Sequence, residues 1–509
     1  MEPRVNIDAL TLDSVTAISR GGAKVTVSDE ARNRVRTFRE HIERINEGER
    51  SIYGVTTGFG ALATTRIPPG ERRELQHAIL RSHAAGMGSS IELEVVRAMM
   101  AIRAKTLAMG HSGTRPELVD ALVNLLNAGI TPAVPKYGSL GASGDLAPLA
   151  HIGLCLTGER WVLQDGRAVP AAEALREASL EPIKLEVKEG LALVNGTDGM
   201  LGTLILALED LRLLLATADV TVAMSIEALF GTDQVYREEL HRLRLHPGQR
   251  ASARNIFQLL ESSKVMASHR TSPHLVQDAY SLRCTPQVYG AARDTLEFAA
   301  QTARRELDST TDNPLVLEDG SVQSCGHFHG EPLAFALDFL AIAASEVGAI
   351  AERRTDRMLD EARSEGLPPF LIPRTGTNSG FMVAQYTSAS LAEENRRLAN
   401  PASTGSLPTS AMQEDHVSMG WSAGMKLRKV LENLSRILAV EALCAAQALD
   451  LRAPLRPAPA TGATHRRVRR EIPFIEEDQF LAPHLKSAEE LVSFGALVEA
   501  AEEVADLER

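Results

Sequence analysis

Aromatic residues are scarce in this chain: 2 Trp, 6 Tyr and 13 Phe make up only 4% of its 509 residues. Because β-sandwich cores use aromatic and β-branched side chains heavily, this scarcity favours cores of Ala, Leu, Val and Ile, which are typical of packed helices. With 44% hydrophobic residues, the chain is long enough to bury one large or several ordinary cores. The composition therefore predicts a mainly helical protein.

An excess of positive charge is also missing. The 54 Lys and Arg residues face 66 Asp and Glu, a formal net charge of -12, which offers no electrostatic footprint for nucleic acid or an anionic membrane. The first residues, MEPRVNIDAL, lack the apolar core of a signal peptide. No uncharged apolar run reaches the roughly 20 residues that a membrane span needs. We therefore expect a soluble, cytoplasmic protein with no nucleic-acid or membrane partner.

Cysteine is rare and scattered. The four cysteines, Cys155, Cys284, Cys325 and Cys444, have no CxxC spacing. This spacing argues against a disulfide framework and against a zinc site, so we expect reduced structural thiols and no bound metal.

Apolar residues at i, i+3, i+4 spacing predict helices along most of the chain. In the first 200 residues they cover 29–46, 74–85, 92–108 and 116–127, beside a β-like stretch at 23–27 and a hairpin that turns at Asp165-Gly166. Longer helices are expected over 199–230, 287–307, 332–360, 380–398, 414–451 and 487–507, whereas 453–470 has the composition of an exposed connection. The expected organisation is a smaller mixed N-terminal region, 1–198, and a long-helix bundle, 199–509, forming one intertwined catalytic unit.

Residues 131–147 contain three Gly and two Pro, which no regular element accommodates easily. Within this loop, Ala142-Ser143-Gly144 has the chemistry for self-cyclisation. The glycine amide, free of a side chain, can attack the carbonyl two residues back, and the serine can lose its hydroxyl as water. The alternative is a tight structural loop with an unmodified Ser143. Asp145 follows directly, either to assist ring formation or to cap the next helix.

The stretch from Gly138 to His151, GSLGASGDLAPLAH, is similar to the signature of the histidine and phenylalanine ammonia-lyase family. Members of that family form 4-methylidene-imidazol-5-one (MIO) from an internal Ala-Ser-Gly. The resemblance covers nearly the whole chain and implies an MIO made from Ala142, Ser143 and Gly144, with no external cofactor. The ring supplies a strong electrophile, which ordinary side chains lack.

The resemblance also implies a fold and an assembly. The fold is a long-helix bundle of the aspartase and fumarase-like superfamily. The assembly is a homotetramer whose active sites are built from more than one chain. Long apolar helices agree with this expectation, because they need partners to cover them.

Two tyrosines match the family's proton-transfer residues. Tyr53, in YGVTTGFG, matches the loop tyrosine proposed to remove the β-proton, and Tyr280 matches a proton carrier near the MIO. A free phenol, with a pKa of about 10, is mostly protonated at neutral pH, so this role requires surroundings that favour phenolate. The alternative for Tyr53 is a merely packed loop side chain.

The segment QDAYSLRC resembles the family's second active segment. By that resemblance Arg283 binds the substrate carboxylate with its planar fork, and Gln277 is a polar contact. Asn195, in LVNGT, matches an asparagine that hydrogen-bonds the MIO or the substrate. Without the resemblance, Arg283 would be assigned to a surface salt bridge and Asn195 to an ordinary Asn-Gly turn.

Substrate choice depends on His83, Met382 and above all Glu414, which resemble the residues that histidine-specific members place around the imidazole. A carboxylate at Glu414 can accept an imidazole N–H, whereas a benzyl substrate would leave it buried and unpaired. The alternatives are a helix-start cap for Glu414 and a core position for Met382. His83 discriminates less, since relatives that act on tyrosine also have a histidine there.

One departure from the family pattern stands at Gly326-His327-Phe328-His329, where Gly-Asn-Phe-His is common. Phe328 is still expected to pack near the MIO, while His327 can alter affinity, pH dependence or the accepted substrate.

As a whole, the resemblance implies a small-molecule substrate, L-histidine, which is converted to trans-urocanate and ammonia in the first step of histidine breakdown. The alternatives are a phenylalanine or tyrosine ammonia-lyase, an aromatic 2,3-aminomutase, and a catalytically silent helical scaffold.

Overall fold

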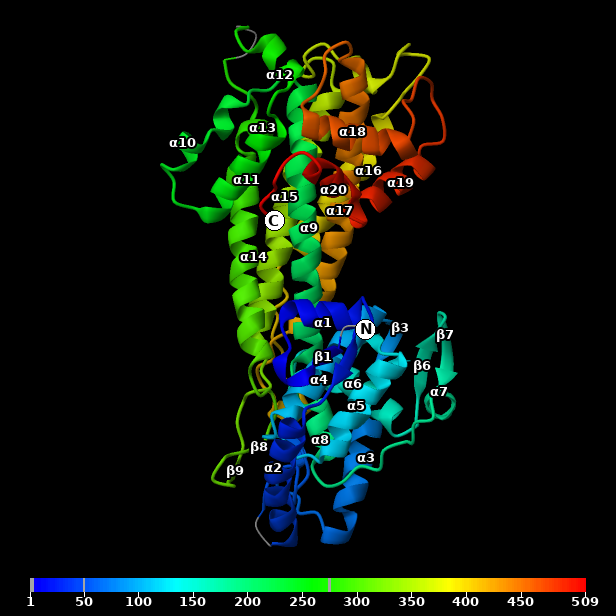
Figure 1. The fold of residues 1–509 in the computed structure, drawn as a ribbon. Helices are drawn as coiled ribbons and strands as arrows, with labels where there is room; N and C mark the ends of the chain where they lie inside the picture. The colour runs from blue at the N-terminus through cyan, green and yellow to red at the C-terminus, as the bar shows by residue number, and fades with distance from the viewer. Residues whose placement is uncertain (1–3, 49–50, 273–275) are drawn as a thin grey trace. The chain divides into compact units, whose positions relative to one another are not determined.

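The computed structural model describes residues 4–48, 51–272 and 276–509, and helices dominate it, which confirms the expected class (Figure 1). The chain divides into two compact units. The first unit comprises Met1–Leu206, Ala299–Asp338 and Pro401–Met425, and the second comprises Ala207–Phe298, Phe339–Asn400 and Lys426–Arg509. Four of the boundaries fall within the long helices α9 (Asp198–Ala228), α14 (Thr285–Leu307), α15 (Glu331–Leu359) and α17 (Gly420–Leu451).

The helices of the first unit are α1 (Leu12–Ser19), α2 (Asp29–Glu47), α3 (Arg72–His83), α4 (Leu93–Ala108), α5 (Pro116–Ala128), α6 (Leu146–Leu156), α7 (Ala171–Glu177) and α8 (Glu189–Val194). Helices α1, α2 and α5 pack against α4, whose side chains are almost all buried, and α3, α6 and α8 pack against one another. The start of α5 at Pro116 and its end at Gly129, with φ of 72°, follow the predicted signals.

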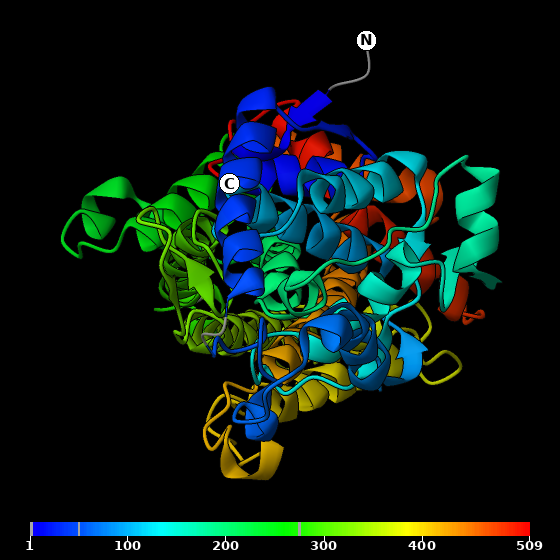
Figure 2. The ribbon, with the colours of Figure 1, turned by 90° about the horizontal axis from the view of Figure 1, so that it is seen from below.

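The strands of the first unit are short and form small separate sheets. Parallel pairing joins β1 (Arg4–Asn6) to β2 (Lys24–Thr26), and antiparallel pairing joins β3 (Met87–Ser90) to β5 (Pro135–Tyr137), β4 (Thr131–Pro132) to β6 (Trp161–Gln164) to β7 (Arg167–Pro170), and β8 (Leu315–Val316) to β9 (Val322–Gln323). Gln164 pairs with Arg167 across Asp165-Gly166, which confirms the predicted hairpin. This hairpin and α7 lie at the outer edge of the first unit (Figures 1 and 2).

A buried apolar cluster fixes the loop that carries Tyr53. Ile52 and Val55 flank this tyrosine, and both are buried against Ile42 of α2 and Val316 of β8. The same cluster includes Val187 and Val322. The loop is therefore attached to the core on both sides of the tyrosine.

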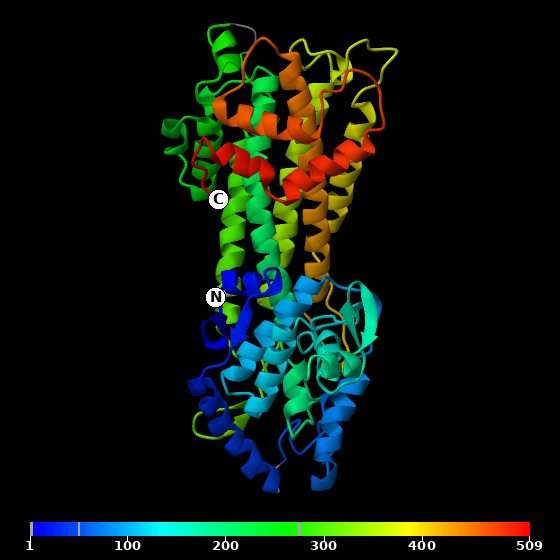
Figure 3. The ribbon, with the colours of Figure 1, turned by 45° about the vertical axis from the view of Figure 1, so that its right-hand side comes forward.

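The second unit is built on long rods, since parts of α9, α14, α15 and α17 run side by side there (Figures 1 and 3). Its shorter helices are α10 (Glu238–His241), α11 (Pro247–Leu259), α12 (Lys264–His269), α13 (Tyr280–Arg283), α16 (Met382–Leu398), α18 (Pro459–Glu471), α19 (Ala482–Ser493) and α20 (Ala496–Glu502). Helix α15 is long and apolar enough to cross a membrane, but 61% of its apolar window is buried inside the structure, as is typical of a core helix.

Three sequence expectations about helices are wrong. The helix expected over 487–507 is broken into α19 and α20 at Gly495, whose φ of 75° lies in the left-handed region. The connection expected over 453–470 contains α18, which begins at Pro459 and buries its small residues, among them Ala463, where it packs against α20. Helix α17 begins at Gly420 rather than at Glu414.

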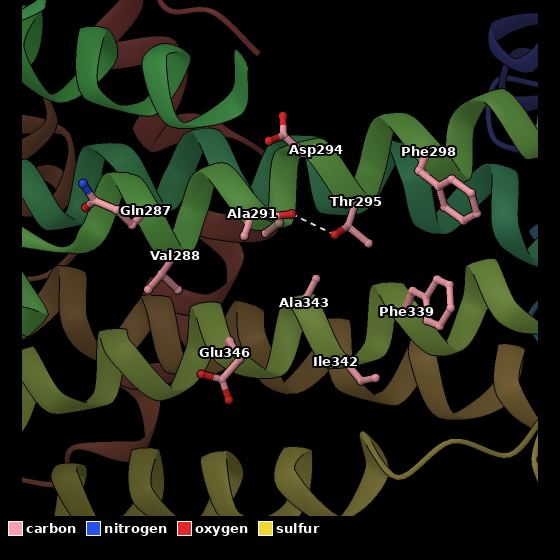
Figure 4. A pocket seen from close by; sticks show the side chains of 11 residues that line it. Gln287, Val288, Ala291, Asp294, Thr295, Phe298, Phe339, Ile342, Ala343 and Glu346 are labelled. Carbon is pink, nitrogen blue, oxygen red and sulfur yellow. Dashed lines mark hydrogen bonds between the residues drawn. The ribbon is translucent and has the colours of Figure 1, made fainter. Parts of the chain in front are cut away.

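An open apolar groove of about 750 Å³ runs between α14 and α15 within the second unit (Figure 4). The rings of Phe298 and Phe339 lie side by side at one end, with centroids 6.0 Å apart. Phe298 is 49% exposed, Phe339 43% and Ile342 41%. Such a cluster of large apolar side chains at a surface is typical of an interaction site.

Candidate active site

The loop between β5 and α6 has the special shape that its sequence predicted. Gly141, Ser143 and Gly144 all have positive φ, of 71°, 52° and 76°. A left-handed serine costs on the order of 1–2 kcal/mol, so the surroundings must hold the loop in this form.

Gly144 packs directly against Gly196. A Cβ added to Gly144 would lie 2.1 Å from the Gly196 carbonyl oxygen, which also accepts a hydrogen bond of 2.7 Å from the amide of Asp145. Residue 144 must therefore be glycine, whose amide nitrogen is also the least hindered nucleophile the backbone offers. The loop thus fits the MIO, which needs such an amide two residues after a carbonyl.

Asp145 caps a helix, but not the one that follows it. Its Oδ2 accepts hydrogen bonds from the amides of Gly199 at 2.7 Å and Met200 at 3.0 Å, in the first turn of α9, and it makes no side-chain cap for α6. Burial raises the pKa of Asp145 to about 7. Its Oδ1 has no hydrogen-bond partner in the described part of the chain.

Glu414 lies beside the cyclising loop. Its Oε1 accepts a hydrogen bond from the Ser143 hydroxyl at 3.3 Å, and its Oε2 accepts one from the Thr409 hydroxyl at 2.8 Å. Backbone hydrogen bonds pair Glu414 with Thr409 as well. Because α17 starts only at Gly420, Glu414 is not a helix-start cap, and its carboxylate is directed to the loop instead.

Tyr53 and His83 both lie within electrostatic reach of Glu414. The Tyr53 hydroxyl accepts a hydrogen bond of 2.9 Å from the amide of Gly60, which favours phenolate. Burial outweighs this contact and raises the pKa of Tyr53, and the charge of Glu414 raises it further. Burial likewise lowers the pKa of His83, at the end of α3. The first unit thus surrounds Tyr53 with an environment that keeps the phenol protonated.

Asn195 and Phe328 also belong to the first unit. Asn195 ends α8 just before Gly196, and its buried side-chain oxygen has no hydrogen-bond partner among the residues described. Phe328 is half-buried, between two histidines. His327 lies 3.1 Å from the Cys325 sulfur through its Nδ1, and His329 contacts the carbonyl oxygen of His416 through its Nε2 at 3.3 Å.

The remaining predicted residues lie in the second unit. The Arg283 guanidinium stands 4.6 Å from the centroid of the Tyr280 ring, and its Nε donates to the Asp278 carbonyl oxygen at 2.9 Å. Tyr280 opens α13 and is 70% exposed, and Gln277 is exposed three residues earlier. Met382 is half-buried as the first residue of α16, where it lines a hollow of about 380 Å³. Tyr280 and Arg283 are therefore adjacent to each other.

Sequence reasoning missed the buried charges behind the loop. Arg103 forms an ion pair with Asp198, and Lys188 forms one with Asp312 at 2.7 Å; all four side chains are at most 1% exposed. A charged residue on a strongly apolar helix, as Arg103 is on α4, was the available signal. In the described ranges no group of three or more His, Cys, Asp or Glu is placed to hold a metal ion.

Comparison with known proteins places these features in context. The model of a family described as aromatic amino acid lyase matches residues 10–470. The chain is 53% identical over 502 residues to a histidine ammonia-lyase of Streptomyces avermitilis, covering 98% of both chains. Among solved structures it resembles histidine ammonia-lyase from Trypanosoma cruzi, with a TM-score of 0.90, 39% identity and coverage of 99% and 96%. It also resembles tyrosine aminomutase from Streptomyces globisporus, with a TM-score of 0.95, 39% identity and 99% coverage of both.

Proposed function

The chain belongs to the aromatic amino acid lyase family, and from this we propose that it converts L-histidine to trans-urocanate and ammonia. The observation that carries the choice of histidine is the position of Glu414, whose carboxylate reaches the Ser143 hydroxyl. A carboxylate there can accept an imidazole N–H, and a benzyl group would leave it desolvated and unpaired. The sequence relatives at about half identity are histidine ammonia-lyases, which supports the same choice.

We propose that Ala142, Ser143 and Gly144 condense into MIO without an external cofactor. The group supplies an electrophile for the substrate's amine, a function that acid–base side chains cannot perform. The positive φ values of Ser143 and Gly144 and the packing of Gly144 on Gly196 support this assignment. No metal is required for this chemistry.

We propose Tyr53 as the base that removes the β-proton, with Tyr280 as a proton carrier. The Gly60 amide aligns the Tyr53 hydroxyl and partly offsets the burial that raises its pKa. A base with a raised pKa is strong once deprotonated, which suits a weakly acidic C–H bond. The cost is a small phenolate fraction at neutral pH.

The substrate-binding roles divide between two groups of residues. In the first unit, Glu414 and His83 take the imidazole, and Asn195 and Phe328 line the loop side of the substrate. In the second, Arg283 and Gln277 bind the carboxylate and Met382 contributes apolar lining. We propose that the second group acts in sites completed by neighbouring chains of a homotetramer.

The groove between α14 and α15 supports such an assembly, because Phe298, Phe339 and Ile342 are too exposed for an isolated soluble chain. A second copy of the chain is the occupant we propose, within a cytoplasmic homotetramer. Sedimentation equilibrium is expected to give four times the chain mass of 55.0 kDa. A monomer at micromolar concentration would contradict the assembly.

An aromatic aminomutase is the second candidate, favoured by the structural likeness to tyrosine aminomutase and by His327. The two activities differ in the fate of nitrogen, which is released by a lyase and kept on the product by a mutase. Purified protein incubated with L-histidine, L-tyrosine and L-phenylalanine distinguishes them through product absorption and ammonia release.

Ser143→Ala tests the proposed chemistry. This variant lacks the hydroxyl that must leave, so we expect no histidine turnover, while the tetramer persists because no helix is altered. The intact mass of the unsubstituted chain is expected about 36 Da below the sequence mass, from two lost waters. Full activity of Ser143→Ala, or an unshifted mass in active enzyme, would refute the proposal.

A further inference from the structure

Arg103 is a fully buried cation that hydrogen-bonds to the turn at the end of α8, next to the cyclising loop. Its Nε donates to Asp198 Oδ2 at 3.0 Å, and its Nη1 donates to the carbonyl oxygens of Ala192 at 3.1 Å and Asn195 at 3.3 Å. Both terminal nitrogens also lie 3.4 Å from the carbonyl oxygen of Thr311. The Arg103 guanidinium thus connects the Asp198 carboxylate, the end of α8 and the loop that contains Thr311.

Gly196 is pressed between this guanidinium and the loop. A Cβ added at Gly196 would lie 1.4 Å from Arg103 Nη2 and 2.6 Å from Asp198 Oδ2. On the other side, the Gly196 carbonyl oxygen accepts the Asp145 amide at 2.7 Å and stands where a Gly144 side chain would be. Arg103, Gly196 and Gly144 therefore form three layers with no room for a side chain between them.

We propose that the Arg103–Asp198 pair is a positioning device for cyclisation of the Ala142-Ser143-Gly144 loop. By fixing Gly196, the pair leaves Gly144 few positions and keeps Ser143 in its left-handed conformation. Folding then restricts the loop to conformations in which the Gly144 nitrogen lies close to the Ala142 carbonyl carbon, so less conformational freedom is lost in the cyclisation step. The inference rests on the ring formation proposed above and assigns no role in turnover to the pair.

The chemical step that the pair assists is balanced without any oxidant. A bond forms from the Gly144 nitrogen to the Ala142 carbonyl carbon, and the Gly144 amide proton passes to the Ala142 oxygen. That oxygen leaves as the first water with the Ser143 amide proton, and a C=N bond forms. Ser143 then loses its Cα proton and its hydroxyl as the second water.

A purely structural role would not need this arrangement. Buried ion pairs often contribute no more to stability than apolar residues of similar volume. The geometry that only arginine supplies is the fork, which reaches two carbonyls of the turn besides the carboxylate. Lysine would keep the charge opposite Asp198 but could not hold the carbonyls of Ala192 and Asn195 as well.

The test measures maturation apart from activity. The chain is made by cell-free synthesis, stopped in acid at intervals, and weighed intact to follow the loss of about 36 Da. We expect Arg103→Lys and Asp198→Asn to cyclise about tenfold more slowly than the unsubstituted chain, because the loop is less restricted. Size-exclusion chromatography and circular dichroism are read on the same samples, so that only assembled protein is compared.

Arg354→Lys is the matched control. Arg354 is another fully buried arginine, paired with Glu441 in the second unit, and its replacement is expected to leave the maturation rate unchanged. Wild-type rates in assembled Arg103→Lys or Asp198→Asn, or equal slowing by Arg354→Lys, would overturn the inference. If the unsubstituted chain itself never loses the mass, the proposed function fails instead.

Discussion

The Ser143 hydroxyl donates a hydrogen bond to Glu414 Oε1 over 3.3 Å, so the carboxylate proposed to bind imidazole begins as a partner of the residue proposed to be dehydrated. Loss of that hydroxyl as water would release Oε1. Oε2 would remain held by the Thr409 hydroxyl at 2.8 Å. Maturation would thus convert a structural contact into an oriented acceptor with one free oxygen.

Glu414→Gln is expected to lower kcat/KM for L-histidine by about 100-fold, which corresponds to about 2.7 kcal/mol and is in the range for a hydrogen bond to a charged group. The amide is nearly isosteric, so the urea midpoint of unfolding should change little. Steady-state kinetics and urea titration on the same preparation measure both effects.

Thr409→Val is the control for Glu414, because it removes the supporting hydroxyl and leaves the carboxylate. It is expected to cost roughly threefold to tenfold in kcat/KM, because the carboxylate that accepts the imidazole N–H stays and only one bond that orients it is lost. Parallel losses of stability and activity in Glu414→Gln would contradict its place in the substrate pocket.

Tyr53 should make turnover depend on pH in one direction. Burial raises the pKa of its phenol, so the active phenolate fraction grows about tenfold per pH unit over the range below that pKa. At saturating histidine, kcat is therefore expected to rise from pH 7 to pH 9, and Tyr53→Phe is expected to be nearly inactive while still losing the mass of two waters. A kcat that is constant over this range would contradict the role as base.

Much of the fold was predictable because helical periodicity is a local property. The expected helix over 116–127 matches α5 within one residue, and the hairpin at Asp165-Gly166 forms as its turn chemistry predicted. The 453–470 region was misjudged because proline and basic residues suggested exposure. In α18 the proline occupies the first turn and small residues face α20, a tertiary contact that composition does not report.

The parts of the candidate site that lie in a short sequence motif were predictable. The contacts that depend on packing between distant segments were not. The loop at Ser143 stood out from its sequence alone. That Asp145 caps α9, and that Arg103 reaches the turn after α8, follow from residues more than 50 positions apart. No local pattern encodes such a pairing, although the burial of an arginine in an apolar helix was a usable hint.

His151, at the end of the loop motif, should make stability sensitive to acid. Its Nε2 accepts the Gly86 amide at 3.2 Å and therefore carries no proton, and burial lowers its pKa to about 4. Protonation of Nε2 would bring its N–H against the N–H of Gly86 in a buried place, so the hydrogen bond between them would be lost. Between about pH 6.5 and pH 4 the unfolded chain binds more protons at this position than the folded chain, so stability is full above this range and falls as the pH drops through it.

We expect His151 to contribute about 2 kcal/mol of stability at pH 7.5 that is lost at pH 5. Because many carboxylates titrate below pH 5, the comparison is made with His151→Gln, whose amide oxygen can still accept the Gly86 amide without titrating. Urea unfolding at pH 7.5 and pH 5, at one protein concentration, gives the difference between the two proteins. An equal loss in both would mean that the imidazole is not the acid-sensitive group, since only the unsubstituted chain has to protonate a ring that faces another donor.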